Sequence, residues 1–197
     1  LYSMTDVYTY GYQGLTKNDR ALNELVYQSM DSSDARKSQF FTPEALGPDY
    51  QFMQASKFTM VDESGEKIFG NNQGKSGISE DYIFMRCSEV ILLLTEAHAQ
   101  MGNAPKVAST IEPLIRKRLG KSEADALLSS IPNMSQDELK TFVFSEWRKE
   151  FWAEGKVYFA MKRLKQSVTR DAHNLYLANQ TLSHSDSRFV LPTGIGI

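Results

Sequence analysis

The chain has 197 residues, of which 41% are hydrophobic and 23% are charged, and its formal net charge is −2. This length holds one domain or at most two small ones, and the composition excludes an intrinsically disordered chain. The near-neutral charge gives no electrostatic reason to expect nucleic acid or an anionic membrane as a partner.

The sequence contains one cysteine, Cys87, so an internal disulfide is excluded. Its longest apolar run, from Val90 to Leu94, is too short to span a bilayer. The sequence begins at Leu1 and opens with no basic-then-apolar signal segment. We therefore interpret it as a fragment or processed product whose targeting segment is missing.

Residues 1–80 are rich in turns and contain one predicted helix. Thr16 and Asp19 form an acidic variant of a capping box, and apolar residues follow at helical spacing. This pattern predicts a helix over about residues 16–30. Residues 31–79 are dense in glycine and proline, which predicts an irregular segment with at most short strands. One such pair is a possible small hairpin of residues 58–61 and 67–69.

Two helices joined by a tight turn are predicted between residues 81 and 119. Gly102 provides a C-terminal stop and Asn103 an N-cap for the next helix. The apolar face predicted for the first helix consists of Tyr82, Met85, Val90, Leu93, Leu94, Ala97 and Met101. The face predicted for the second consists of Val107, Ile111, Leu114, Ile115 and Leu119. Cys87 falls within the first helix, where a packed thiol is expected rather than a nucleophile.

Further helices are predicted over the next 46 positions, residues 120–165. A short helix covers about residues 123–130 and ends before Pro132. Ser135 and Glu138 form a capping box for a helix that continues to Gly155, and another helix follows over about residues 156–165. Helix pairs with short links are typical of stacked antiparallel hairpins, each of which needs a neighbour to cover its apolar face. The sequence therefore predicts an all-α, repeat-like fold.

Glu146, Glu150 and Glu154 are spaced by four positions and share one face of the predicted helix. Like charges at this spacing repel, so the face requires cations from other helices. Arg86 is the expected partner of Glu150 or Glu154, and further arginines at 116, 118 and 163 are available. Structural ion pairing is the favoured interpretation, and acid–base chemistry or metal binding is the alternative.

Several motifs occur in a fixed order between about residues 30 and 195. The first two are an Asp-x-Arg element ending at Arg36 and a Lys57-Phe58 pair. Next comes a stretch from Arg86 to Asn103 in which an arginine and a glutamate precede an apolar run. The last are a stretch from Glu146 to Gly155, followed by Lys162-Arg163, and a closing stretch from Arg188 to Pro192. In order and spacing they resemble the SusD/RagB family. Thr95 replaces an alanine of the family pattern. Val157 and Ala160 stand where the family pattern has an arginine and an aspartate. We interpret this double change as the replacement of a helical ion pair by apolar packing.

This resemblance implies a single, partial SusD/RagB-like domain over residues 1–197 with tetratricopeptide-like helical hairpins. Within it, we expect a loop-rich segment with one helix at 1–80, hairpins at 81–165 and an irregular tail at 166–197. The resemblance also implies a surface-exposed lipoprotein of the outer membrane. Such a protein would bind polysaccharides, oligosaccharides or other nutrients and sit over a SusC-like TonB-dependent transporter. The lipid anchor and the first helical repeats would then precede Leu1.

Aromatic side chains in predicted loops are the candidate ligand contacts, because sugar rings stack on flat aromatic faces. These candidates are Tyr8, Tyr10, Tyr12, Tyr50 and Phe52. The alternative is that they pack onto the helices. The three histidines lack metal-ligand spacing, so we expect no catalytic residue, metal or cofactor. Besides nutrient binding, a helical scaffold for a protein partner remains an alternative function, and an enzyme is the third.

Overall fold

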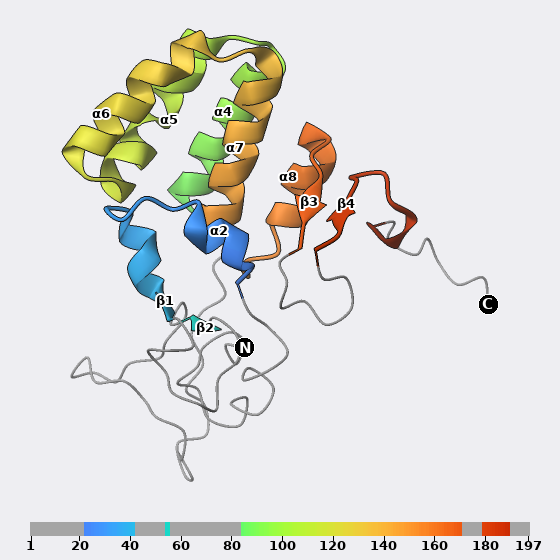
Figure 1. Cartoon of the computed structure of the whole chain (residues 1–197). Coiled ribbons are helices and arrows are strands. Elements are labelled where there is room, and N and C mark those ends of the chain that lie inside the picture. Colours follow the sequence, from blue (N-terminus) through green and yellow to red (C-terminus); the bar gives the residue numbers. More distant parts are fainter. Residues whose placement is uncertain (1–21, 42–53, 56–83, 171–178, 190–197) are drawn as a thin grey trace.

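The structure is a computed structural model that describes residues 22–41, 54–55, 84–170 and 179–189 (Figure 1). Helices dominate these residues, and the fold is all-α, as predicted. Each strand is two residues long: β1 (Phe40–Phe41) pairs with β2 (Gln54–Ala55), and β3 (Val168–Thr169) pairs with β4 (Thr181–Leu182), both antiparallel. None of the described helices combines the length and apolar content that crossing a membrane requires.

The hairpin predicted between residues 81 and 119 is confirmed. Helix α4 (Cys87–Gln100) is followed by helix α5 (Ala104–Arg118) after a short turn. In that turn Gly102 has a φ of 69°, and the Asn103 side chain caps α5 by accepting a hydrogen bond from the backbone N–H of Lys106. Helix α4 begins at Cys87 rather than near position 81, and residues 81–83 lie outside the described residues.

Substituting Gly102 with alanine is expected to lower the free energy of unfolding by about 1–2 kcal/mol, because a side chain at positive φ is strained. A Cβ atom there would lie 3.8 Å from Gln136, an ordinary contact, so backbone strain alone carries the effect. Gly102→Asn should cost less, because asparagine tolerates this conformation. Denaturant unfolding of both variants checks the prediction, and an equal loss would contradict it.

Two further helices and a 3-10 turn follow α5. Helix α6 (Lys121–Ser130) runs into the 3-10 turn of Ile131–Asn133, and helix α7 (Gln136–Glu150) begins with the predicted capping box of Ser135 and Glu138. Helix α7 ends at Glu150, five positions before the predicted end at Gly155. The physical reason is the backbone at Ala153 and Gly155, whose φ values of 62° and 73° are incompatible with a continuing right-handed helix.

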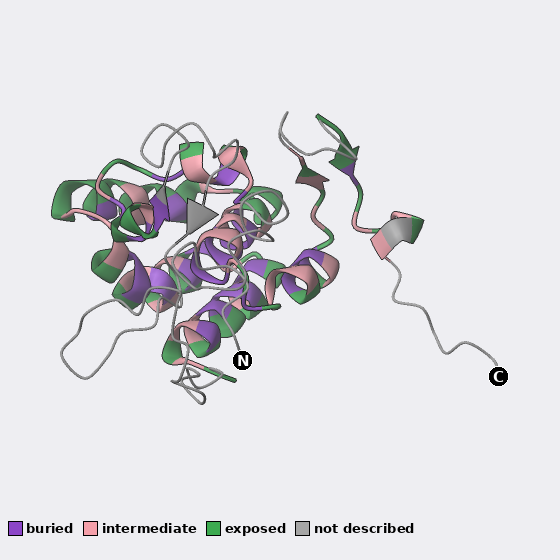
Figure 2. Ribbon diagram, turned by 90° about the horizontal axis from the view of Figure 1, so that it is seen from below, coloured by how far each residue is buried: buried purple, intermediate pink, exposed green. Residues whose placement is uncertain are grey.

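Helix α8 (Val157–Leu164) runs beside α7 and ends at Lys165, which adopts the left-handed conformation. The main core lies between these helices, with their buried faces turned inward (Figure 2). Its largest fully buried side chains include Trp147, Phe151, Leu92, Ile111 and Ile115. The apolar face predicted for α5 is therefore correct, with Leu119 only partly buried.

The face predicted for α4 is wrong. Val90, Leu93, Leu94, Ala97 and Met101 are exposed, as is Met85, which precedes the helix; Tyr82 lies outside the described residues. The buried face consists of Glu89, Leu92, Thr95, Glu96 and Ala99. Charged groups can lie inside here because they form ion pairs: Arg163 binds Glu96 at 2.6 Å, and Lys156 lies 3.1 Å from one carboxylate oxygen of Glu89. The other oxygen of Glu89 has no hydrogen-bond partner among the described residues. The thiol of Cys87 is exposed as well, contrary to the expected packed position.

A smaller apolar cluster joins the N-terminal segment to the end of α7. Helix α2 (Glu24–Gln28) and the 3-10 helix η1 (Ala35–Gln39) position Leu22, Val26, Met30 and Phe40. The ring of Phe40 meets that of Trp152 edge-on at 5.4 Å between centroids. Of the helix expected over residues 16–30, positions 16–21 lie outside the described residues, and so does the possible hairpin at 58–69.

Candidate functional site

The acidic row of α7 lies in the interior. Glu146 and Glu150 are 2% and 3% exposed, and Glu154, just beyond the helix, is 7% exposed. A buried carboxylate without a partner is strongly destabilising. The contacts of these three side chains therefore determine what the row can do.

Glu146 is bound by one arginine from the N-terminal segment. The Nη1 of Arg36 lies 2.9 Å from Oε2 of Glu146, and its Nη2 lies 2.7 Å from Oδ2 of Asp34. Lys149, one turn further along α7, reaches the other oxygen of Glu146 at 2.9 Å. Burial alone would lower the pKa of Arg36, but its hydrogen bond to Asp34 and the charge of Glu146 raise it above the ordinary value. The guanidinium is therefore held fully charged.

Glu150 is the centre of the cluster, because three arginines converge on it: Arg36, at 3.5 Å, and two others. Arg118, at the end of α5, makes a two-pronged contact with its carboxylate at 2.7 and 2.9 Å. Arg86, just before α4, donates to the same carboxylate and also to the backbone oxygen of Glu150 at 2.6 Å. Arg86 completes its contacts with Glu154, at 2.9 and 3.0 Å. Glu150 and Glu154 are the two carboxylates for which Arg86 was the expected partner.

The α7 cluster thus holds four carboxylates and four cations. They are Asp34, Glu146, Glu150 and Glu154, with Arg36, Arg86, Arg118 and Lys149. Its net charge is zero, and it connects the N-terminal segment, α4, α5 and α7. Two arginines considered from the sequence lie elsewhere: Arg116 pairs with Glu112 and Asp125, and Arg163 with Glu96. Among the residues described, no group of three or more His, Cys, Asp or Glu side chains is arranged to hold a metal ion.

The electrostatics of Glu150 make the stability of the protein sensitive to acid. Burial would raise the pKa of Glu150, but hydrogen bonds from Arg118 and Arg86, and their charges, lower it to about 2. An unfolded glutamate titrates near pH 4.3, so Glu150 contributes stability above about that pH. The contribution, on the order of 3 kcal/mol, is lost as the pH falls through about 2.

The free-energy difference between the wild type and Glu150→Gln should accordingly shrink as the pH is lowered from about 5 to about 2. Denaturant unfolding at a series of pH values measures it. The control is Glu112→Gln, in an exposed ion pair, which should change stability little throughout. A difference for Glu150→Gln that stays constant down to pH 2 would contradict the assignment.

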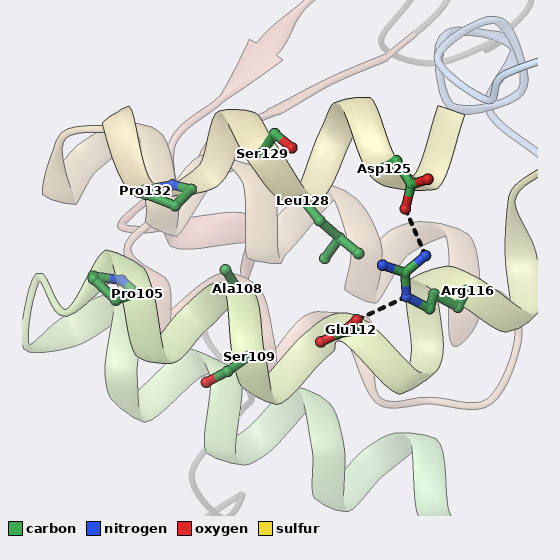
Figure 3. A pocket seen from close by; sticks show the side chains of 9 residues that line it. All are labelled: Pro105, Ala108, Ser109, Glu112, Arg116, Asp125, Leu128, Ser129 and Pro132. Atoms are coloured by element: carbon green, nitrogen blue, oxygen red, sulfur yellow. Dashed lines mark hydrogen bonds and ion pairs between the residues drawn. The ribbon is translucent and has the colours of Figure 1, made fainter. Parts of the chain in front are cut away.

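A second feature is an open groove of about 460 Å³ between α5 and α6 (Figure 3). Its lining residues are Pro105, Ala108, Ser109, Glu112, Arg116, Asp125, Leu128, Ser129 and Pro132. One end is closed by Arg116, which bridges Glu112 and Asp125, and the two prolines stand at the other end. The described residues that line the groove include no aromatic ring, so they offer no flat apolar platform on which a sugar stacks.

The aromatic candidates for ligand contact, Tyr8, Tyr10, Tyr12, Tyr50 and Phe52, all lie outside the described residues. The structure therefore brings together the three glutamates with Arg86 and Arg118, leaves Arg116 and Arg163 in other ion pairs, and does not place the aromatic candidates. Sequence reasoning missed the part played by Asp34 and Arg36 in the cluster. The available signal was the Asp-x-Arg element, which was recognised as a motif but not connected to the acidic row 110 positions away.

The fold and the cluster define an all-α protein built from helical hairpins that are locked together by buried ion pairs. Comparison with known families identifies it further: the model of the SusD family matches residues 7–189. The chain therefore belongs to the SusD family.

A curated relative, the SusD-like protein P2 of Formosa agariphila, is 29% identical over 154 residues. The match covers 71% of this chain but 30% of the relative, so the chain spans less than a third of that protein's length.

Proposed function

We propose that the protein binds glycans or other nutrients at the bacterial cell surface and delivers them to a SusC-like TonB-dependent transporter. The observation that carries this proposal is the match of the SusD family over residues 7–189. A lipid anchor in the outer membrane and a single domain that includes residues 1–197 are parts of the same proposal. The ligands would be polysaccharides or oligosaccharides contacted by aromatic side chains.

We also propose that the α7 cluster is structural and performs no chemistry. A general acid or nucleophile must present a free or poised group to its substrate. Here Glu150 accepts from three arginines and has a lowered pKa, which makes it a poor proton donor. Glu146 and Glu154 are likewise bound by Arg36 and Arg86. These contacts support a structural role for the three carboxylates.

Affinity electrophoresis and calorimetry of the complete gene product against a panel of polysaccharides test the proposal. We expect saturable binding to at least one polysaccharide, without release of reducing sugar. If Tyr50 or Phe52 stacks on the ligand, its replacement by alanine should weaken binding roughly tenfold, the effect of about 1.4 kcal/mol. The matched control is Phe159→Ala, which removes an exposed aromatic ring from α8.

Other results would favour other functions. Failure to bind any glycan, together with specific capture of a protein partner, would favour a helical scaffold, for which the open α5–α6 groove is the supporting observation. Sugar release that is abolished by Glu150→Gln would show that the protein is an enzyme.

A further inference from the structure

Arg148 of helix α7 has no carboxylate partner among the described residues. Five other arginines each bind at least one carboxylate: Arg36, Arg86, Arg116, Arg118 and Arg163. Arg148 is half-buried, and within the described part of the chain its guanidinium takes part in no hydrogen bond or ion pair. Its contact is with the buried ring of Phe144, one turn earlier, whose centroid lies 5.9 Å from Cζ of Arg148.

The surroundings of Arg148 disfavour its charge. Burial lowers the pKa of Arg148 below its ordinary value, and no nearby anion opposes that effect. Burial also lowers the pKa of Arg86, but hydrogen bonds to Glu154 and Glu150 outweigh it and raise that pKa. A guanidinium stays protonated in proteins, so the half-buried charge of Arg148 is present and costs stability. Charges held in this way are typical of functional sites.

The acidic row of α7 cannot neutralise Arg148. Glu146 and Glu150 are each two positions away, which is about 200° around a helix axis, so they lie on nearly the opposite side of α7. Both carboxylates are also bound by other cations. A counter-ion for Arg148 must therefore come from elsewhere.

The side of α7 that carries Arg148 meets segments from both ends of the chain. Thr141, seven positions earlier and so on the same side, hydrogen-bonds Gln166 at 3.2 Å, shortly before β3. Just beyond the helix, the ring of Trp152 meets Phe40 of β1. Helix α2 also lies against α7 (Figure 1). Seams between packed elements are common places for ligands to bind.

We propose that Arg148 binds an anionic group of a polysaccharide, either the carboxylate of a uronic acid or a sulfate ester, so that the ligands of the protein are acidic glycans. This inference rests on the proposed function and names the class of glycan. A guanidinium presents its N–H donors in a planar fork that matches the oxygens of a carboxylate or sulfate. The Phe144 ring supports that fork from one side. The net charge of −2 gives no long-range attraction to a polyanion, so recognition depends on this local contact.

The experiment compares variants of the complete gene product by calorimetry. The ligands are acidic polysaccharides, each paired with its own carboxyl-reduced or desulfated form. Arg148→Gln should weaken binding of the acidic form roughly 10- to 100-fold, the effect of losing a hydrogen-bonded charge. Arg148→Lys should recover part of the affinity, because it keeps the charge but not the fork. The control is Lys117→Gln, which removes an exposed cation from α5 and should change nothing.

The chemical pairs identify the anion. A loss of wild-type affinity on carboxyl reduction assigns the contact to a uronate, and a loss on desulfation assigns it to a sulfate ester. In either case the neutral form should bind the wild type about as weakly as the acidic form binds Arg148→Gln.

Thermal unfolding separates a binding role from a structural one. Without glycan, Arg148→Gln should unfold at the wild-type temperature or above it, because the change removes an unpaired, half-buried charge. Adding the acidic glycan should raise the unfolding temperature of the wild type and have little effect on the variant. A variant that unfolds several degrees lower without glycan would show that Arg148 has a structural partner, and would overturn the inference.

The binding results also distinguish this inference from the proposed function. Glycan binding that is equal in the wild type and Arg148→Gln, or that survives removal of the acidic groups, would overturn the inference and leave nutrient binding in place. Binding to neutral polysaccharides alone would do the same. Failure to bind any polysaccharide would overturn both.

Discussion

Replacing Arg36 with methionine is expected to lower the free energy of unfolding by about 3–5 kcal/mol, the typical cost of breaking a buried ion pair from one side. The side chains of Arg36, Asp34 and Glu146 are 4%, 1% and 2% exposed, so water cannot replace the lost guanidinium. Glu146 keeps Lys149, but among the described residues the Asp34 carboxylate is left with only the backbone N–H of residue 36. Denaturant unfolding of the purified protein measures the loss.

Arg116→Met is the matched control. Arg116 also binds two carboxylates, those of Glu112 and Asp125, at 2.7 Å each, but its side chain is 43% exposed. Exposed pairs contribute roughly 0–1 kcal/mol, so this variant should unfold close to the wild type. Similar losses for the two variants would show that burial does not determine the strength of these contacts.

Truncating Phe151 to alanine is expected to cost about 3–5 kcal/mol, as for other buried aromatic side chains. Phe151 is fully buried, its ring centroid lies 4.9 Å from that of Trp147, and the guanidinium of Arg86 lies 4.1 Å above its ring. The variant therefore opens a cavity and also removes the surface on which Arg86 rests. Thermal or denaturant unfolding gives the magnitude.

Phe159→Ala provides the comparison, since Phe159 lies on the neighbouring helix α8 and is 53% exposed. Its truncation should cost less than about 1 kcal/mol, because little area is returned to water. If it costs as much as Phe151→Ala, the division of these aromatics into core and surface is wrong.

Local signals predicted the helical elements well. The turn at Gly102 and Asn103 and the capping box of Ser135 and Glu138 both depend on neighbouring residues, and both are present in the structure. The sequence predicted the end of α7 at Gly155, after its actual end at Glu150, because alanine is not a residue type that indicates a left-handed backbone at position 153. Such a conformation is set by the packing around it.

The direction in which α4 faces could not be read from its sequence. Periodicity identifies the more apolar side of a helix, and a core is normally assigned to that side. In α4 the inner side instead contains Glu89 and Glu96, and only their pairing with Lys156 and Arg163 makes that possible. Partners more than 60 positions away are invisible to a local pattern. The same limit concealed the contact between Arg36 and Glu146.

The separation between Arg36 and Glu146 has a consequence for the rates of folding and unfolding. Joining residues 110 positions apart requires closing a long loop, whereas the α4–α5 hairpin needs only neighbours. We therefore expect the hairpins to form first and the Arg36 contact to be added after the main transition state. An interaction formed that late slows unfolding and leaves the folding rate almost unchanged. The α7 cluster would then contribute mainly to kinetic stability: it would lower the unfolding rate of the native protein more than it raises the folding rate.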